Sequence, residues 1–260
     1  MQHIPRKRFG QNFLIDHSII DAIVRDIDPK AGDCVIEIGP GLAAITQPLL
    51  ARLPHLHVVE IDRDIVARLS RLYPPDQLTI HSTDALKFDF STVGKDLRIV
   101  GNLPYNISSP LLFHLAEYRH LIRDMHFMLQ KEVVDRMVAE PGTSDYGRLS
   151  VMLQYRFHLE WLLDVPPTSF DPPPKVDSAV VRLIPREDLI LSAEVEKVLS
   201  PLVTAAFSQR RKTVRNTLAG WFDAEALQAL GVNPGDRAEN LSVHTYIKLA
   251  EAAVQRAAAR

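Results

Sequence analysis

The chain has almost no cysteine and no long apolar stretch. Cys34 is the single cysteine among 260 residues, so an internal disulfide is excluded and a reducing compartment is favoured. No run of about 18 apolar residues occurs, which argues against a membrane-spanning helix. The basic N-terminus continues into the polar residues 9–12, so no signal peptide is predicted. Only His55 and His57 are closely spaced histidines, and no metal site is predicted. We expect a cytoplasmic protein with no membrane partner.

Acidic residues are missing from two basic segments, although the net charge of the whole chain is only −2. Residues 1–15 and 197–222 carry eight lysines and arginines and no acid, which leaves 22 basic against 32 acidic residues elsewhere. Each basic segment is either a phosphate-binding surface or a solvated one. The eight basic residues are Arg6, Lys7, Arg8, Lys197, Arg210, Arg211, Lys212 and Arg215.

Alternating strand and helix patterns fill the first two thirds of the chain. Hydrophobic residues make up 46% and charged residues 24%, as in globular proteins with a core. A helix is predicted at 42–53, bent or weakened at Pro48, and another begins near Arg63 after Asp62 as cap. This alternation predicts an α/β fold with a parallel sheet. Strands are predicted at 34–38, 57–61, 77–81, 97–101, 125–129 and 176–183.

The pattern changes after Pro185. Five prolines between Pro166 and Pro174 predict a stiff, extended loop. Beyond this loop and the last predicted strand, the strand signals stop. Helices are predicted there at 195–207, 211–221, 224–230 and 243–260. We therefore expect two domains: residues 1–185 with the sheet, and residues 186–260 as a small all-helical domain.

The turn after the first predicted strand has the composition of a nucleotide-binding turn. Gly39 and Gly41 lie between this strand and a helix, where glycine lets the backbone approach a ligand closely. Glu60 ends the next strand, 19 residues after Gly41, where an acid can accept hydrogen bonds from both ribose hydroxyls. A dinucleotide site fits this spacing, and so does a structural turn with a surface glutamate.

Three acids narrow the choice of ligand. Glu37, Glu60 and Asp84 lie at the ends of the first three predicted strands. Asp84 can accept from an adenine amino group, although alone it also fits a helix cap. An acid-lined pocket repels a pyrophosphate but attracts the sulfonium and ammonium groups of S-adenosylmethionine. The predicted cofactor is therefore S-adenosylmethionine.

Residues 101–105, Gly-Asn-Leu-Pro-Tyr, follow the fourth predicted strand and resemble the Asn/Asp-x-Pro-aromatic turn of methyltransferases that act on exocyclic amines. The side-chain oxygen of Asn102 and the carbonyl of Leu103 can accept the two N–H groups of an adenine amine, which directs its lone pair toward a methyl carbon. Pro104 stiffens the turn. Tyr105 can stack on the base, a contact worth about 1–3 kcal/mol. Taken alone, the pattern also fits a structural turn with a core tyrosine.

Six segments together resemble the KsgA/RsmA family of ribosomal RNA adenine dimethyltransferases, from about residue 6 to about residue 250. This resemblance implies a Rossmann-like methyltransferase sheet dependent on S-adenosylmethionine, followed by a small helical domain. It also implies N6,N6-dimethylation of two adjacent adenosines in the 3′-terminal hairpin loop of 16S rRNA, within the immature small subunit. The segments are residues 6–14 (RKRFGQNFL), 37–41 (EIGPG), 102–110 (NLPYNISSP), 146–150 (YGRLS), 170–178 (FDPPPKVDS) and 207–212 (FSQRRK).

Individual roles follow from the same resemblance. Asn12 and Leu14 would close over the donor. Glu60 would bind the donor's ribose, and Asp84 its adenine. The implied donor-binding residues are Asn12, Leu14, Glu37, Gly39, Gly41, Glu60, Asp84 and Asn102. The implied catalytic turn is Asn102, Leu103, Pro104 and Tyr105.

The target base must leave its stack to reach this turn, so we expect an unpaired or flipped-out adenosine. Phe170, in the proline-rich loop, can form the second face of a base sandwich. The partner is then 16S rRNA, bound by a protein expected to be monomeric. Contacts to RNA phosphates are expected from Arg6, Lys7, Arg8, Arg210, Arg211, Lys212 and Arg215.

Three alternatives remain open at this point. An Erm-type methyltransferase of 23S rRNA is a close relative, although residues 106–110 and the near-neutral charge favour the KsgA/RsmA type. A non-catalytic nucleic-acid-binding factor with a methyltransferase fold is less compatible with the intact turn at 102–105. A nicotinamide-dependent dehydrogenase leaves this turn, the proline-rich loop and the basic segment at 210–215 unexplained.

Overall fold

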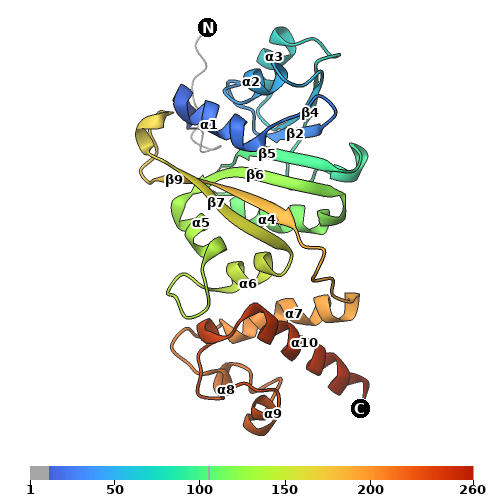
Figure 1. Cartoon of the computed structure of the whole chain (residues 1–260), viewed down its shortest axis with the longest axis vertical. Helices are drawn as coiled ribbons and strands as arrows, with labels where there is room; N and C mark the ends of the chain where they lie inside the picture. Colours follow the sequence, from blue (N-terminus) through green and yellow to red (C-terminus); the bar gives the residue numbers. More distant parts are fainter. Residues whose placement is uncertain (1–11, 105, 260) are drawn as a thin grey trace. The chain divides into compact units, whose positions relative to one another are not determined.

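The computed structural model describes residues 12–104 and 106–259, which divide into two compact units (Figure 1). The first unit comprises the described residues up to Val134 together with Leu159–Pro185. The second comprises Asp135–His158 and the described residues from Arg186 onward. Within the described ranges, no helix combines the length and apolar character needed to cross a membrane.

The division differs from the expected boundary at 185/186, because residues 135–158 group with the C-terminal helices. Helix α6 (Arg148–Gln154) packs on α7 (Ala193–Ala206) and on α10 (Val243–Ala258). The ring of Tyr146 also contacts that of Phe207, with centroids 6.2 Å apart. The middle segment supplies apolar surface that the C-terminal helices cover, so the second unit is built from two stretches of chain.

A seven-stranded sheet forms the centre of the first unit, in the order β4-β3-β2-β5-β6-β9-β7. The pairs β2–β3, β3–β4, β2–β5 and β5–β6 are parallel, and β9 is antiparallel to β6. The predicted α/β fold is therefore correct. The strands are β2 (Cys34–Ile38), β3 (Leu56–Glu60), β4 (Leu78–Ser82), β5 (Leu97–Asn102), β6 (Ile122–Gln130), β7 (Phe157–Val165) and β9 (Ser178–Pro185).

The strand order reverses beside β2, whose two neighbours are β3 and β5. In open α/β sheets, ligands bind outside the carboxyl ends of the strands at such a switch point. The turn after β2 contains Gly39 and Gly41, and β5 ends at Asn102. The topology therefore brings the two most informative sequence motifs to the same edge of the sheet.

Two helices of the first unit begin at side-chain caps. Asp16 caps α1 by accepting from the amides of Ser18 and Ile19, and Asp62 caps α3 as predicted. The helices of the first unit are α1 (His17–Ile27), α2 (Thr46–Leu50), α3 (Arg63–Leu72) and α4 (Ser108–Glu117), and α5 (Lys131–Val138) crosses from the first unit into the second. The second unit also contains α8 (Val214–Thr217) and α9 (Ala224–Ala229).

Two predicted helices are shorter than expected. The predicted helix at 42–53 is reduced to α2, because Gly41 and Ala43 have φ angles of 53° and 74°, which a right-handed helix excludes. Pro48 lies in the first turn of α2, where a missing N–H costs little. The predicted helix at 211–221 is reduced to α8, so residues 210–212 lie in a turn instead of on a helix.

A small second sheet joins the start of the described chain to the proline-rich loop. Strand β1 (Phe13–Leu14) pairs antiparallel with β8 (Phe170–Asp171), with Leu14 opposite Phe170. The amide of Ile15 then donates to the carbonyl of Ser169 at 2.9 Å. No sequence pattern predicts this pairing, because each strand is only two residues long.

Candidate functional site

A pocket of about 280 Å³ opens at the carboxyl ends of β2, β3 and β5, within the first unit. It brings together eleven residues that were predicted from distant parts of the sequence. All eight predicted donor-binding residues line it, and so do Leu103, Pro104 and Phe170. Among the described residues that line it are three acids and no lysine or arginine. The site therefore presents negative charge to a ligand.

The glycine turn brings backbone to the floor of this pocket. Gly39 and Gly41 have φ angles of 68° and 53°, a backbone conformation that residues other than glycine rarely adopt. The amide of Gly39 donates to the carbonyl of Val59 at 2.9 Å, which ties the turn to β3. A Cβ at Gly41 would lie 3.2 Å from the ring of Phe13. Glycine is thus required here both by conformation and by the close approach of the N-terminal segment.

Glu37 is buried with only one short contact to a side chain. It is 2% exposed, and its Oε2 accepts a hydrogen bond from Thr46 Oγ1 at 2.6 Å. Burial raises the pKa of Glu37 to about 7, the Thr46 hydroxyl opposes this shift, and the charge of Glu60 adds to it. Glu37 therefore keeps its proton to a higher pH than an exposed glutamate does.

Glu60 and Asp84 both accept hydrogen bonds from nearby backbone amides. Glu60 Oε1 accepts from the Asp62 amide at 2.8 Å, and burial raises the pKa of Glu60, although backbone amides including that of Gly41 oppose the shift. Asp84 Oδ1 accepts from the Leu86 amide at 3.0 Å, but residues 85–87 form a turn and no helix begins there, so Asp84 is not a helix cap. Both side chains line the pocket, and the contact with Leu86 leaves Oδ2 of Asp84 for a ligand there.

The turn after β5 is fixed by backbone bonds on both sides. The amide of Leu103 donates to the carbonyl of Met128 at 3.1 Å, and the carbonyl of Pro104 accepts from the amide of Ile107 at 3.2 Å. Asn102 Nδ2 donates to the carbonyl of Asn12 at 3.3 Å. The Nδ2 group of Asn102 thus forms its hydrogen bond inside the protein. This leaves Oδ1 as the atom suited to accept a hydrogen bond from a substrate N–H.

Two supporting residues were not predicted. A Cβ at Gly101 would lie 2.5 Å from the carbonyl oxygen of Ile38, so only glycine lets β5 pass this close to β2. Thr46 is fully buried against Glu37. Gly101 precedes the Asn-Leu-Pro turn directly, and that position is the signal that could have identified it. Thr46 carries no comparable signal in the sequence.

Comparisons with known proteins identify the family. A family model described as "Ribosomal RNA adenine dimethylase" matches residues 2–255. The chain belongs to this family. A "Ribosomal RNA small subunit methyltransferase A" of Thiobacillus denitrificans is 67% identical over 94% of this chain and 96% of its own length. The protein of the same name from Chromobacterium violaceum is 64% identical over 96% and 95%. The predicted family is confirmed.

Two solved structures agree with this assignment of the fold. A dimethyladenosine transferase from Plasmodium falciparum superposes with a TM-score of 0.79 at 29% identity, covering 91% of this chain and 95% of its own. The 23S rRNA methyltransferase ErmE superposes with a TM-score of 0.73 at 26% identity, covering 92% and 98%. The predicted methyltransferase sheet with C-terminal helices is therefore confirmed.

The predicted RNA contacts of this ribosomal RNA adenine dimethylase are only partly described. Arg6, Lys7, Arg8 and Tyr105 lie outside the described residues. Arg210, Arg211, Lys212 and Arg215 are exposed in the second unit, and Arg210 Nη2 donates to the carbonyl of Ser144 at 3.1 Å. Three of these four charges are consecutive residues in the turn before α8, and Arg215 lies on α8 itself. Their contact with RNA remains a prediction.

Proposed function

We propose that this chain transfers methyl groups from S-adenosylmethionine to the N6 amines of two adjacent adenosines in the 3′-terminal hairpin loop of 16S rRNA. The observation that carries the proposal is the pocket itself, in which the Asn102 turn lies beside three acids at the sheet edge where open α/β sheets bind their ligands. The names of the relatives that are 64–67% identical to this chain favour the small subunit as the substrate.

The charge of the pocket suits the donor. When bound, S-adenosylmethionine supplies an electron-poor methyl group on a positively charged sulfur. Glu37, Glu60 and Asp84 provide negative charge in a partly desolvated site, where charge pairing is stronger than in water. A phosphate-bearing dinucleotide would meet the same three acids without a compensating cation. The residues present therefore fit a cationic nucleoside better than NAD.

The amide of Asn102 and the carbonyl of Leu103 orient the target amine. An adenine amine is a weak nucleophile because its lone pair is delocalised into the ring. Two acceptors that hold its two N–H groups pull the lone pair out of this conjugation and fix its direction. The Asn12 carbonyl holds the Asn102 amide in the orientation that this requires. Phe170, which lines the pocket on β8, provides an aromatic face for the flipped base.

A methyl-transfer assay separates this proposal from its alternatives. Small and large ribosomal subunits from cells that lack this activity are incubated with the protein and methyl-labelled donor. We expect label only in 16S rRNA, recovered as N6,N6-dimethyladenosine. Label in 23S rRNA would instead support the Erm-type activity, which the ErmE superposition keeps structurally open. Donor binding without any transfer would favour a non-catalytic factor. The expected monomeric state is checked by sedimentation of the same sample.

A further inference from the structure

The N-terminal segment and the proline-rich loop meet at one carboxylate. Asp16 Oδ1 accepts from the amides of Ser18 at 3.0 Å and Ile19 at 3.3 Å, which caps α1. Asp16 Oδ2 accepts from Ser169 Oγ at 3.0 Å, across 153 residues of sequence. A helix cap needs only one side-chain oxygen. The second oxygen of Asp16 is therefore used for a different purpose, the connection between two pocket-lining segments.

Both segments joined by this bond line the donor pocket. Asn12, Phe13 and Leu14 lie two to four residues before Asp16, and Phe170 directly follows Ser169. The Asn12 carbonyl also receives the hydrogen bond of Asn102. Ser169 is 1% exposed, so its hydroxyl is held away from water and depends on this partner. A shift of Asp16 would therefore move residues 12–14, beside the methyl donor, and Phe170, beside the target base, together.

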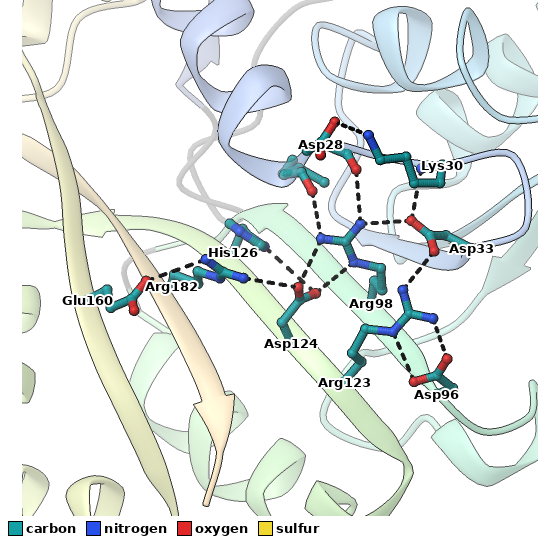
Figure 2. A network of polar contacts seen from close by, with 11 residues as sticks. Asp28, Lys30, Asp33, Asp96, Arg98, Arg123, Asp124, His126, Glu160 and Arg182 are labelled. Carbon is teal, nitrogen blue, oxygen red and sulfur yellow. Dashed lines mark hydrogen bonds and ion pairs between the residues drawn. The ribbon is translucent and has the colours of Figure 1, made fainter.

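The far end of α1 is held equally firmly. Arg98 Nη2 donates to the carbonyl of Ile27 at 2.6 Å, and Arg98 Nη1 donates to that of Asp28 at 3.3 Å (Figure 2). Arg98 lies at the start of β5, the strand that ends at Asn102. The C-terminal end of α1 is thus bound to the start of β5. Asp16, at the N-terminal end of α1, lies four residues after Asn12, which contacts Asn102 at the end of β5. This arrangement gives Asp16 a fixed position relative to the catalytic turn.

We propose that Asp16 is a positioning residue for methyl transfer, which uses its bond to Ser169 to hold residues 12–14 and Phe170 in one arrangement around the donor. Hydrogen bonds from Ser18 and Ser169 lower the pKa of Asp16, so its carboxylate stays ionised as an acceptor across the neutral range. The inference rests on the proposed function, because it assigns Asn12 to the donor side and Phe170 to the base side.

Three variants separate the connection from the cap. Ser169→Ala removes the side-chain connection and leaves intact the cap and the backbone bonds from the Ile15 and Asp16 amides to the carbonyl of residue 169. Asp16→Ser retains a good capping residue whose single oxygen is too short to serve both partners. The matched control is Asp89→Ser, because Asp89 accepts from the amide of Ser91 at 3.0 Å and from its hydroxyl at 2.6 Å, the same distances that Asp16 has to Ser18. Asp89 does not line the pocket.

Donor binding is the first measurement, by calorimetry on the full chain. We expect Ser169→Ala and Asp16→Ser each to weaken S-adenosylmethionine binding by about three- to tenfold, the usual effect of one lost hydrogen bond. The double variant should be no weaker than the worse single one, since both changes remove the same contact. Asp89→Ser should bind the donor like the wild type, while its melting temperature falls about as much as that of Asp16→Ser.

Unchanged donor affinity in Ser169→Ala, or fully additive losses in the double variant, would overturn the proposal. Steady-state kinetics give a second readout: the KM for donor should rise more than kcat falls, which a general loss of folded protein would not produce. The outcome is independent of the proposed substrate. If the wild type binds donor but methylates no 16S rRNA, the proposed function fails and the binding comparison still decides the role of Asp16.

Discussion

The two ends of β5 carry buried charge in opposite ways. At its start, Arg98 is enclosed by acids: Nη1 lies 2.7 Å from Asp33, and Nε and Nη2 form a two-pronged contact with Asp124 at 2.9 and 2.8 Å (Figure 2). At its end, Asn102 opens onto a pocket that holds three acids and, among the described residues, no lysine or arginine. The first cluster is neutralised by the protein, and the second is left for a ligand to neutralise.

The pKa values reflect this difference. Burial opposes ionisation of Asp33, but hydrogen bonds from the Lys30 amide, Arg98 and Arg123 outweigh it and lower its pKa to about 2. Burial of Glu37 is opposed only by the hydroxyl of Thr46, and its pKa rises to about 7. One sheet thus uses paired charge for stability at the starts of its strands and unpaired charge for binding at their ends.

Removing Arg98 should produce the largest effect on stability. Arg98→Met leaves Asp124 buried without its two-pronged partner, leaves Asp33 with Arg123 alone and frees the carbonyl of Ile27, so we expect the free energy of unfolding in urea to fall by about 3–5 kcal/mol. Arg123→Met is the matched control. It contacts the same Asp33, but its side chain is 43% exposed, and we expect a loss below about 1 kcal/mol. Equal losses would contradict the role assigned to burial.

Removing the Asn102 amide should produce the largest effect on activity. Asn102→Ala deletes one of the two acceptors for the target amine, and we expect kcat to fall about 100-fold while unfolding stability changes little. Single-turnover transfer to small subunits measures this. Asn106→Ala is the control, since Asn106 is exposed and lines the same pocket outside the proposed acceptor pair. A normal rate in Asn102→Ala would exclude the proposed activation of the amine.

Sequence patterns predicted the strand ends well because those ends carry short, sharply defined signals. Strand β2 has the predicted bounds, and β3 and β4 differ from prediction by one residue at each end. The edge strand β7 (Phe157–Val165) was missed, because half-buried and exposed residues interrupt its apolar pattern. Helix α1 was missed as well, although Asp16 has a capping sequence. Local patterns thus located the parallel core and failed toward the edges of the fold.

The site residues that could be predicted are those whose residue type and position in the sequence indicate a particular chemical role. Glycines, acids and the Asn102 turn are recognisable from sequence alone, and the pocket brings them together. The partners that set their behaviour come from tertiary contacts. The contact of Thr46 with Glu37 and that of Ser169 with Asp16 join residues 9 and 153 positions apart, and serine and threonine occur everywhere in proteins. Nothing in the sequence pattern selects these particular hydroxyls.

The titration of Glu37 tests whether the pocket's negative charge is reserved for the donor. Because a cationic donor favours the ionised carboxylate, affinity for S-adenosylmethionine should rise as pH increases toward about 7, by at most tenfold per pH unit, and level off above. Calorimetry from pH 6 to pH 8 measures this. Glu37→Gln should flatten the profile, and the neutral thioether product should show a weaker dependence than the sulfonium donor. A steep profile in Glu37→Gln would assign the titration to another group.

The contribution of Glu37 to the free energy of unfolding should fall as pH rises, whereas donor affinity should rise. The folded pKa of Glu37 is raised from 4.5 to about 7, so the protonated form is favoured by folding. This contribution is complete below about pH 4.5 and is lost as pH rises through about 7. Relative to the wild type, Glu37→Gln should therefore become more stable as pH increases over this interval, without ligand. The same substitution thus improves stability and weakens donor binding above neutral pH.

Exposed charges of the second unit differ from both the paired charges at the start of β5 and the acids of the pocket. We expect their removal to have the smallest effect on stability and on binding. Arg211 is exposed in the turn before α8, so neutralising it should cost no stability and should remove about one phosphate contact. For Arg211→Ala we expect the slope of log affinity for 16S rRNA against log salt concentration to become shallower by about 0.7. Arg71→Ala, an exposed arginine on α3, is the control and should leave the slope unchanged. If both variants keep the wild-type slope, the charge at Arg211 belongs to a solvated surface, and charge used for binding is confined to the acidic pocket.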